Sequence, residues 1–260
     1  MLVDIHFHTY VYSPDELKVA LQDIEDNELF LCSVTCDIPD WVQTREICSI
    51  SPRIIPMFGI HPEKAPLYFD NLSILNPYME EALMFGEIGL DHNWISDSSQ
   101  YGAQEKLLSY FLESAEREGK PVMLHTNGAE EEVLALLETH SITKAIFHDY
   151  DCSVELFKRI VDNGYYISIG RVILEEYKAR VANWEHFLEL AKETPEDLLL
   201  TETDGPPRDR RMPHSLLVEV VERLAVLRME PFEETASAGV RNFKKIIHDD
   251  SRFESYLRYF

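Results

Sequence analysis

The chain has 260 residues, of which 45% are hydrophobic and 11% aromatic, so it can bury a sizeable core and does not belong to the disordered class. Its 47 acidic and 24 basic residues give a net charge of −23, which argues against a protein that coats a long nucleic-acid duplex. No apolar run approaches the ~20 residues needed to cross a bilayer, and the N-terminus lacks the features of a signal peptide. We therefore expect a soluble, cytoplasmic chain with no membrane contact and with four free cysteines.

Strand-like runs alternate with helix-like stretches along the whole chain. The strands are expected at residues 2–8, 29–36, 53–60, 83–88, 121–125, 144–148, 165–169 and 198–203. Ser13 opens the first helix as its N-cap, with Pro14 at the first helical position and Glu16 at the third. Further helices are expected at residues 40–50, 100–118, 130–139, 154–163, 184–192, 213–227 and 232–247, with a less regular helical region up to residue 79.

Eight strands that alternate with helices over ~250 residues match a single (β/α)8 TIM barrel, an α/β fold, which we expect to span residues 1–260 as one domain. The competing topology is a doubly wound open sheet. That fold should show a Gly-rich phosphate loop after a strand, and the sequence contains none. The barrel prediction also locates the functional face, because the strands of such barrels end at the catalytic side.

Six groups that can bind a metal lie at or just beyond the ends of the predicted strands. His6 and His8 stand two residues apart, so a strand directs both imidazoles to one face. The other four are Glu87, His125, His148 and Asp204. Taken singly, each is more often a hydrogen-bonded turn or cap residue, but six coincidences at one barrel face favour a common site. Four imidazoles with two carboxylates suit zinc, manganese or a similar ion.

Several segments, in order along nearly the whole chain, resemble the TatD-like metal-dependent hydrolases, a branch of the amidohydrolase-type barrels. The matching segments are Asp4-Ile5-His6-Phe7-His8, Phe58-Gly59-Ile60-His61-Pro62, Gly86-Glu87-Ile88-Gly89-Leu90-Asp91, Pro121-Val122-Met123-Leu124-His125, Phe147-His148 and Leu200-Thr201-Glu202-Thr203-Asp204-Gly205-Pro206. The third and the last of these are the most specific, whereas the His-x-His opening is common to many barrel hydrolases.

The resemblance implies a hydrolase with two divalent metal ions, Zn, Mn or Mg. One ion would be held by His6, His8, Glu87 and Asp204. Glu87 would bridge to a second ion, which His125 and His148 also bind, because each oxygen of a carboxylate can serve one ion. Glu87 and Asp204 are the predicted catalytic residues, and Asp204 would also accept a proton from the attacking water.

Four further residues are predicted on the substrate side of the site. His61 is expected to line the pocket, or alternatively to brace the loop at Pro62. Asp91 is expected to contact substrate, or to orient a ligand histidine, or to cap the following loop. Arg171 and Arg208 are placed to meet a phosphate on the open face.

For the basic cluster of Arg208, Arg210 and Arg211, the alternative is a solvated loop with surface ion pairs. His92 and Trp94 could stack on a base, although covering the barrel mouth is the favoured interpretation.

The substrate side also departs from the family pattern. Family members usually follow the fifth-strand histidine with Ser-Arg-Asp or Cys-Arg-Asp, whereas this chain has Thr126-Asn127-Gly128 and therefore no arginine there. After the sixth strand, His148-Asp149-Tyr150-Asp151-Cys152 replaces the usual His-Cys-Phe-Ser-Gly.

We therefore expect a metal-dependent phosphodiesterase or deoxyribonuclease that acts on DNA ends, single strands or a small phosphoester. The alternatives are a small-molecule amidohydrolase, lactonase or ester-type deacylase, and a barrel kept as a binding or scaffold subunit. Nothing in the sequence indicates an oligomeric state.

Overall fold

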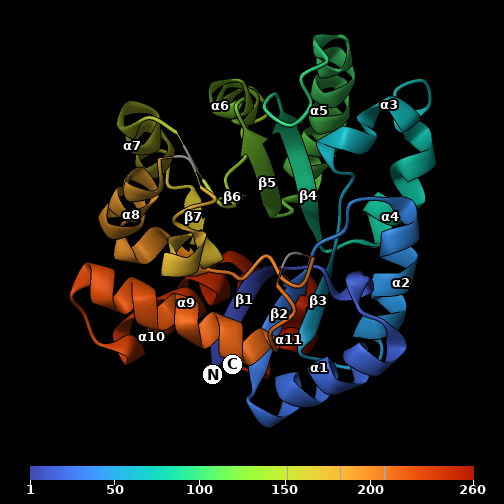
Figure 1. Ribbon diagram of the computed structural model, residues 1–260. Helices are drawn as coiled ribbons and strands as arrows, with labels where there is room; N and C mark the ends of the chain where they lie inside the picture. The colour runs from blue at the N-terminus through green and yellow to red at the C-terminus, as the bar shows by residue number, and fades with distance from the viewer. Residues whose placement is uncertain (151, 182, 208) are drawn as a thin grey trace.

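The computed structural model describes residues 1–150, 152–181, 183–207 and 209–260. Within these ranges, eight parallel strands form a sheet in which each strand pairs with the next one along the chain, as the (β/α)8 prediction requires (Figure 1). The strands are β1 (Leu2–Phe7), β2 (Leu29–Ser33), β3 (Ile54–Phe58), β4 (Met84–Asp91), β5 (Val122–Asn127), β6 (Ala145–Phe147), β7 (Tyr166–Ile169) and β8 (Leu199–Thr201).

The barrel closes where the end of β1 meets the segment after β8. The backbone amide of His8 donates to the carbonyl of Gly205 at 2.7 Å. Below this contact, the buried carboxylate of Asp4 accepts hydrogen bonds from the Thr203 amide at 3.1 Å and the Thr203 hydroxyl at 2.6 Å. Burial outweighs these donors and raises the pKa of Asp4 to about 8. The first and last strands are thus tied together directly beside His8.

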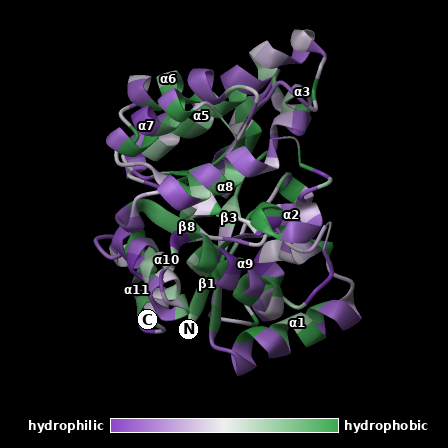
Figure 2. Cartoon of the chain, turned by 60° about the vertical axis from the view of Figure 1, so that its left-hand side comes forward, coloured by the Kyte–Doolittle hydropathy of each residue, from purple (hydrophilic) through white to green (hydrophobic). Residues whose placement is uncertain are grey.

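Helices follow the strands and cover the outside of the barrel. They are α1 (Pro14–Asp26), α2 (Ile38–Cys48), α3 (Ala65–Tyr68), α4 (Asn76–Glu81), α5 (Tyr101–Glu118), α6 (Glu130–Thr139), α7 (Val154–Asp162), α8 (Trp184–Glu193), α9 (Pro213–Arg228), α10 (Phe232–Ile247) and α11 (Glu254–Leu257). Apolar residues follow the strands and polar residues the outer faces of the helices (Figure 2). In the part of the chain described, no helix combines the length and the apolar character that a membrane span needs.

Side chains fill the barrel interior, so substrate can approach only at the open mouth. Met57, Met84 and Met123 point from neighbouring strands into one buried cluster. At the bottom, the rings of Phe30 and Phe243 lie 5.9 Å apart, and the C-terminal Phe260 packs against both. The C-terminal segment therefore covers the end of the barrel opposite the catalytic face.

Gly89 allows β4 and β5 to approach closely next to the functional site. Its φ of +153° is one that side-chain-bearing residues rarely adopt, and a Cβ there would lie 1.8 Å from the carbonyl oxygen of His125. Gly89 pairs with His125 in the parallel ladder. The glycine thus fixes how close Glu87, two residues earlier on β4, comes to His125.

Candidate metal centre

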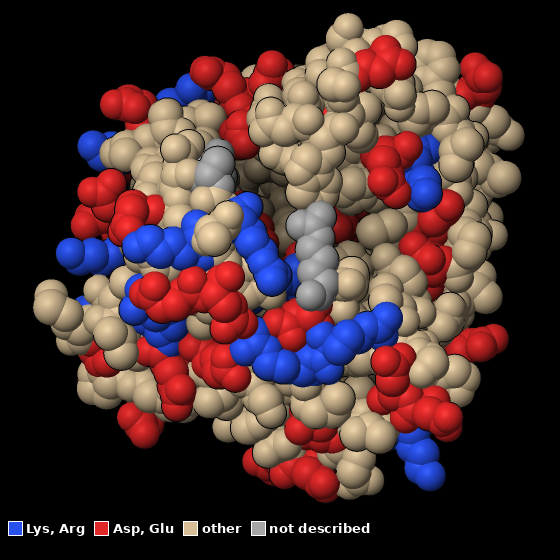
Figure 3. All heavy atoms as spheres, viewed as in Figure 1, with Lys and Arg blue, Asp and Glu red and all other residues tan. Residues whose placement is uncertain are grey.

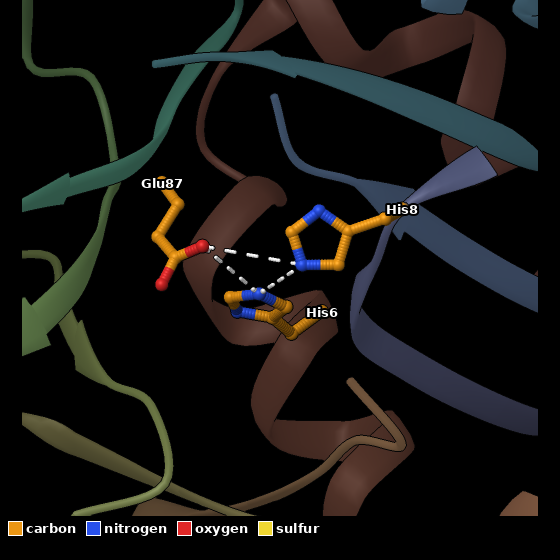
Figure 4. Close-up of side chains that lie close together, drawn as sticks. All are labelled: His6, His8 and Glu87. Atoms are coloured by element: carbon orange, nitrogen blue, oxygen red, sulfur yellow. Dashed lines mark hydrogen bonds and ion pairs between the residues drawn. The ribbon is translucent and has the colours of Figure 1, made fainter. Parts of the chain in front are cut away.

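Glu87 lies at the centre of the predicted site, with one pair of histidines facing each of its carboxylate oxygens. Oε2 lies 3.6 Å from Nε2 of His6 and 4.0 Å from Nε2 of His8 (Figure 4). Oε1 lies 2.7 Å from Nδ1 of His125 and 3.5 Å from Nε2 of His148. Glu87 is buried, and although burial alone would raise its pKa, His6 and His125 hold that pKa well below the usual range. An anionic carboxylate is thus shared by two sets of imidazoles.

Asp204 completes the predicted set of six from the segment after β8. Its backbone is left-handed, with φ at +50°. Its Oδ1 lies 3.1 Å from Nε2 of His8 and 3.7 Å from Nε2 of His6. The structure therefore brings together all six residues that the sequence placed at the strand ends.

The donor atoms suit divalent cations. Nε2 of His6 and Nε2 of His8 lie only 3.2 Å apart, so two nitrogen lone pairs converge on one position beside Glu87. One group of atoms that could hold an ion comes from His6, His8 and Glu87, and another comes from His61, Glu87 and His125. Both groups use Glu87. Mixed imidazole and carboxylate donors at such spacing are typical of zinc or manganese sites.

Two further carboxylates orient the histidines that face Oε1 of Glu87. Oδ2 of Asp91 lies 2.8 Å from Nε2 of His125, which leaves Nδ1 to face Glu87. Oε1 of Glu202 lies 2.7 Å from Nδ1 of His148, which leaves Nε2 to face the same oxygen. Burial opposes charge on His125, but Asp91 and Glu87 together raise its pKa to about 9. Carboxylates in this position fix the ring orientation of metal-binding histidines.

Asp91 is fully buried, and its other oxygen accepts from the backbone amide of Trp94 at 2.7 Å. Of the alternatives for Asp91, this geometry favours orienting His125 and capping the loop, and it leaves no oxygen for substrate. Glu202, which is buried two positions before Asp204, was not among the residues predicted from the sequence. The available signal was its place at the end of a predicted strand, because strand ends lie at the catalytic face of such a barrel.

Arg171, in the 3-10 helix η5 (Arg171–Ile173), binds Asp204 rather than facing solvent. Its Nη2 lies 2.6 Å from Oδ2 of Asp204, and its Nη1 donates to the carbonyl of Thr203 at 2.5 Å and to that of Asp204. The arginine is 2% exposed. The expectation that Arg171 meets a substrate phosphate is thus not supported, because its guanidinium already holds Asp204 in place. Asp204 keeps one oxygen, Oδ1, directed at the histidines.

His61 braces the loop at Pro62, which was the alternative considered for it, and its ring also faces the site. Its Nδ1 accepts a hydrogen bond from the backbone amide of Glu63 at 3.3 Å, and this bond caps the 3-10 helix η2 (Pro62–Lys64). Its Nε2 lies 3.9 Å from Oε1 of Glu87. Burial lowers the pKa of His61 to about 4, so the ring that faces the site is neutral near pH 7.

His8 has a hydrogen-bond chain behind it that the sequence did not reveal. The hydroxyl of Tyr10 lies 3.1 Å from Nδ1 of His8 and donates to Sγ of Cys36 at 3.3 Å. When the Tyr10 hydroxyl donates its hydrogen bond to the sulfur, its oxygen can accept a hydrogen bond from the Nδ1–H group of His8. His8 then presents a lone pair on Nε2 toward Glu87 and Asp204.

A cavity of about 450 Å³ opens from the site to the surface, with His125, His148 and Asp204 among its lining residues. Trp94 also lines it and is 62% exposed, with its ring 5.6 Å from that of His125, in keeping with a position at the mouth. His92 instead stacks on Tyr101 at 3.7 Å.

The basic cluster after β8 is largely neutralised in the structure. Arg210 pairs with Glu16 at 3.2 Å. Arg211 pairs with Asp209 and also contacts two glutamates, Glu176 and Glu219. These two arginines therefore form surface ion pairs, which was the alternative considered for the cluster. Arg208, predicted to bind substrate, lies outside the described residues.

Comparison with known proteins agrees with this geometry. The family model described as TatD related DNase matches residues 3–248. YcfH of Escherichia coli K12, named a metal-dependent hydrolase, is 25% identical over 98% of this chain and 98% of its own. The Salmonella typhimurium protein named 3'-5' ssDNA/RNA exonuclease TatD is 29% identical over 66% of this chain and 69% of its own.

The solved structure of YjjV, a TatD homologue from E. coli K12, has the same fold, with a TM-score of 0.82 at 23% identity over 95% of this chain and 98% of that one. The family match covers nearly the whole sequence, from the second residue of β1 to beyond the end of β8. The chain belongs to the TatD-related DNase family and is a metal-dependent hydrolase.

Proposed function

We propose that this protein is a phosphodiesterase that cleaves DNA ends or single strands with two divalent metal ions, Zn, Mn or Mg. One observation carries the proposal: the two oxygens of Glu87 each face a separate pair of histidines. That arrangement suits a carboxylate that bridges two cations, and paired cations are common in enzymes that cleave phosphodiesters. The family description and the name of the Salmonella relative support a nucleic-acid substrate.

When bound, the ions would lower the pKa of a water molecule and neutralise charge on the phosphate. His6, His8 and Asp204 would hold one side of the pair, and His125 and His148 the other. Glu87 would belong to both sides. Asp91 and Glu202 keep the rings of His125 and His148 in the required orientation.

Asp204 is the proposed proton acceptor, at Oδ1, because Oδ2 is bound to Arg171. The water oxygen would form a bond to phosphorus while the ester P–O bond breaks. Oδ1 would take the water proton. The leaving oxygen would depart as an alcohol, protonated from solvent at the open mouth.

The test uses protein purified without chelator, labelled single-stranded DNA, and added Mg²⁺, Mn²⁺ or Zn²⁺. Elemental analysis should find about two ions per chain. Glu87→Ala and Asp204→Asn should abolish cleavage, whereas Arg210→Ala, a change in a surface ion pair, should retain it. Cleavage that survives both site substitutions would refute the proposal.

A second candidate is hydrolysis of a small amide, lactone or ester at the same site. The size of the cavity, about 450 Å³, favours it, because such a pocket suits one small molecule. The charge of −23 also disfavours a long polyanion. No reaction with any nucleic acid, together with turnover of a lactone or amide, would decide for this candidate.

A further inference from the structure

The cavity at the barrel mouth has two chemically different walls above the candidate metal ligands. The segment after β7 contributes an apolar wall that includes Val172, Val181 and Phe187. Another part of the lining is more polar and includes Asn93 and Asn127, whose side chains are joined by a hydrogen bond of 2.8 Å. A ligand that fills this space would meet apolar surface on one side and amide groups on the other.

Among the described residues, two arginines line the cavity, and one of these has its charge available. Arg171 is buried and bound to Asp204. Arg180 is exposed, and among the described residues it forms no ion pair. Its guanidinium carbon lies 5.7 Å from the centroid of the Tyr177 ring, and the Tyr177 hydroxyl is in turn held by Asp209 at 3.0 Å. Arg180 therefore has a fixed aromatic support and an unused guanidinium edge.

Several other cations that the structure describes on this side of the barrel are paired with carboxylates. Lys and Arg side chains gather beside a central hollow, interspersed with Asp and Glu (Figure 3). Lys178 pairs with Glu185 at 3.0 Å, and Arg223 pairs with Glu175 at 2.8 Å. In a chain with a net charge of −23, an uncompensated arginine at the mouth of the site stands out.

We propose that Arg180 binds a phosphate of the substrate, and that the cavity accepts the terminal nucleotide of a single strand. The inference rests on the proposed phosphodiesterase function and names its substrate-binding cation. A guanidinium forms paired hydrogen bonds with phosphate, which offsets the repulsion from the acidic groups nearby. A volume of about 450 Å³ is in the range of pockets that enclose one small ligand, so it has room for one nucleotide and not for a duplex.

Recognition of one nucleotide also agrees with the overall charge. The rest of a DNA strand would extend into solvent over an acidic surface, where each added phosphate would contribute no favourable binding free energy. The KM should therefore change less than about threefold when oligo-dT is lengthened from 3 to 12 nucleotides. A KM that keeps falling steeply with length would overturn the single-nucleotide part of the proposal.

The variants Arg180→Ala and Arg180→Lys test the role of the guanidinium, with Mn²⁺-loaded enzyme and short oligo-dT as substrate. Loss of one charged hydrogen-bond donor should raise KM about ten- to hundredfold while kcat changes less than about threefold. Arg180→Lys should recover part of the loss. The matched control, Arg210→Ala, removes the same charge from a residue paired with Glu16 and should change KM less than about twofold. Equal effects of Arg180→Ala and Arg210→Ala, or an unchanged KM in Arg180→Ala, would overturn the proposal.

A binding measurement separates this inference from the proposed function. Calorimetry with thymidine monophosphate needs no turnover and uses the same metal-loaded protein. Binding that weakens at least tenfold in Arg180→Ala but not in Arg210→Ala supports the subsite even if no phosphodiester is cleaved. Absent binding, or binding that Arg180→Ala leaves unchanged, refutes it. Failure of the wild-type enzyme to cleave any nucleic acid would count against the phosphodiesterase function alone.

Discussion

Replacing Arg171 by alanine should destabilise the metal-free protein strongly, because it breaks a buried ion pair between the segments that follow β7 and β8. The arginine side chain is 3% exposed and that of Asp204 is 20% exposed, so water screens little of their interaction at 2.6 Å. Truncating one member of such a pair costs about 3–5 kcal/mol, since the buried carboxylate loses the cation that compensates its charge. For a chain of this size that loss should lower Tm by about 6–20 °C.

A double-mutant cycle in chelator-treated protein isolates the contribution of the pair. Arg171→Ala, Asp204→Asn and the double variant are compared by urea unfolding. The two residues touch, so their effects should be non-additive by about 1–3 kcal/mol. Arg223→Ala is the matched control, because its partner Glu175 is 67% exposed and that ion pair should contribute less than about 1 kcal/mol. The reasoning is refuted if Arg171→Ala costs no more than Arg223→Ala, or if the cycle is additive.

Three further predictions concern single residues. Asp91→Asn removes the carboxylate behind His125 and should weaken metal affinity about ten- to hundredfold in a chelator competition, and an unchanged affinity would contradict the orienting role. Gly89→Ala places a Cβ against the His125 carbonyl and should lower the free energy of unfolding by at least about 3 kcal/mol. Urea unfolding of the soluble variant measures this loss, and a variant as stable as the wild type would disprove the close approach. Burial raises the pKa of the Cys48 thiol to about 12. This folded value lies above the unfolded value of about 8.5, so the resulting stability is present below pH ~8.5 and is lost as pH rises toward 12. At pH 8, Cys48 should react with a thiol reagent far more slowly in folded than in urea-unfolded protein, and equal rates would rule out the shift.

Most elements of the fold could be predicted from local signals. The helices α6 and α10 have the predicted bounds, 130–139 and 232–247. Each has an apolar stripe and begins just after a helix breaker, Gly128 or Pro231. The region after β3 was predicted only as an irregular helical stretch, and it contains four short helices, η2, α3, η3 (Leu72–Leu75) and α4. Pro62, Pro66 and Pro77 lie at or near the starts of three of them, and proline suits the first turn of a helix and not its interior. Regular periodicity therefore cannot continue through this region.

The strand ends of the site were predictable because a barrel brings equivalent positions together whatever their separation in sequence. The partners that long side chains bind could not be predicted from the sequence. Arg171 could extend to solvent or fold back on Asp204, and the choice depends on how the segments after β7 and β8 pack. Tyr10 and Cys36 likewise meet only because β1 and β2 are adjacent. Such contacts depend on three-dimensional packing and leave no periodic signal in the chain.

The charges around the site indicate why metal and substrate binding should depend on each other. Among the described residues, five carboxylates lie at or beside the strand ends: Glu87, Asp91, Asp149, Glu202 and Asp204. With the imidazoles neutral, as metal ligands must be, Arg171 offsets only one of these charges. The remaining excess would repel a phosphate, and two divalent cations would balance it. Metal binding should therefore raise the affinity for a nucleotide, and by thermodynamic linkage the nucleotide should raise the affinity for metal by the same factor. Arg180 could then hold a phosphate at the mouth only after cations have neutralised the carboxylates beneath it.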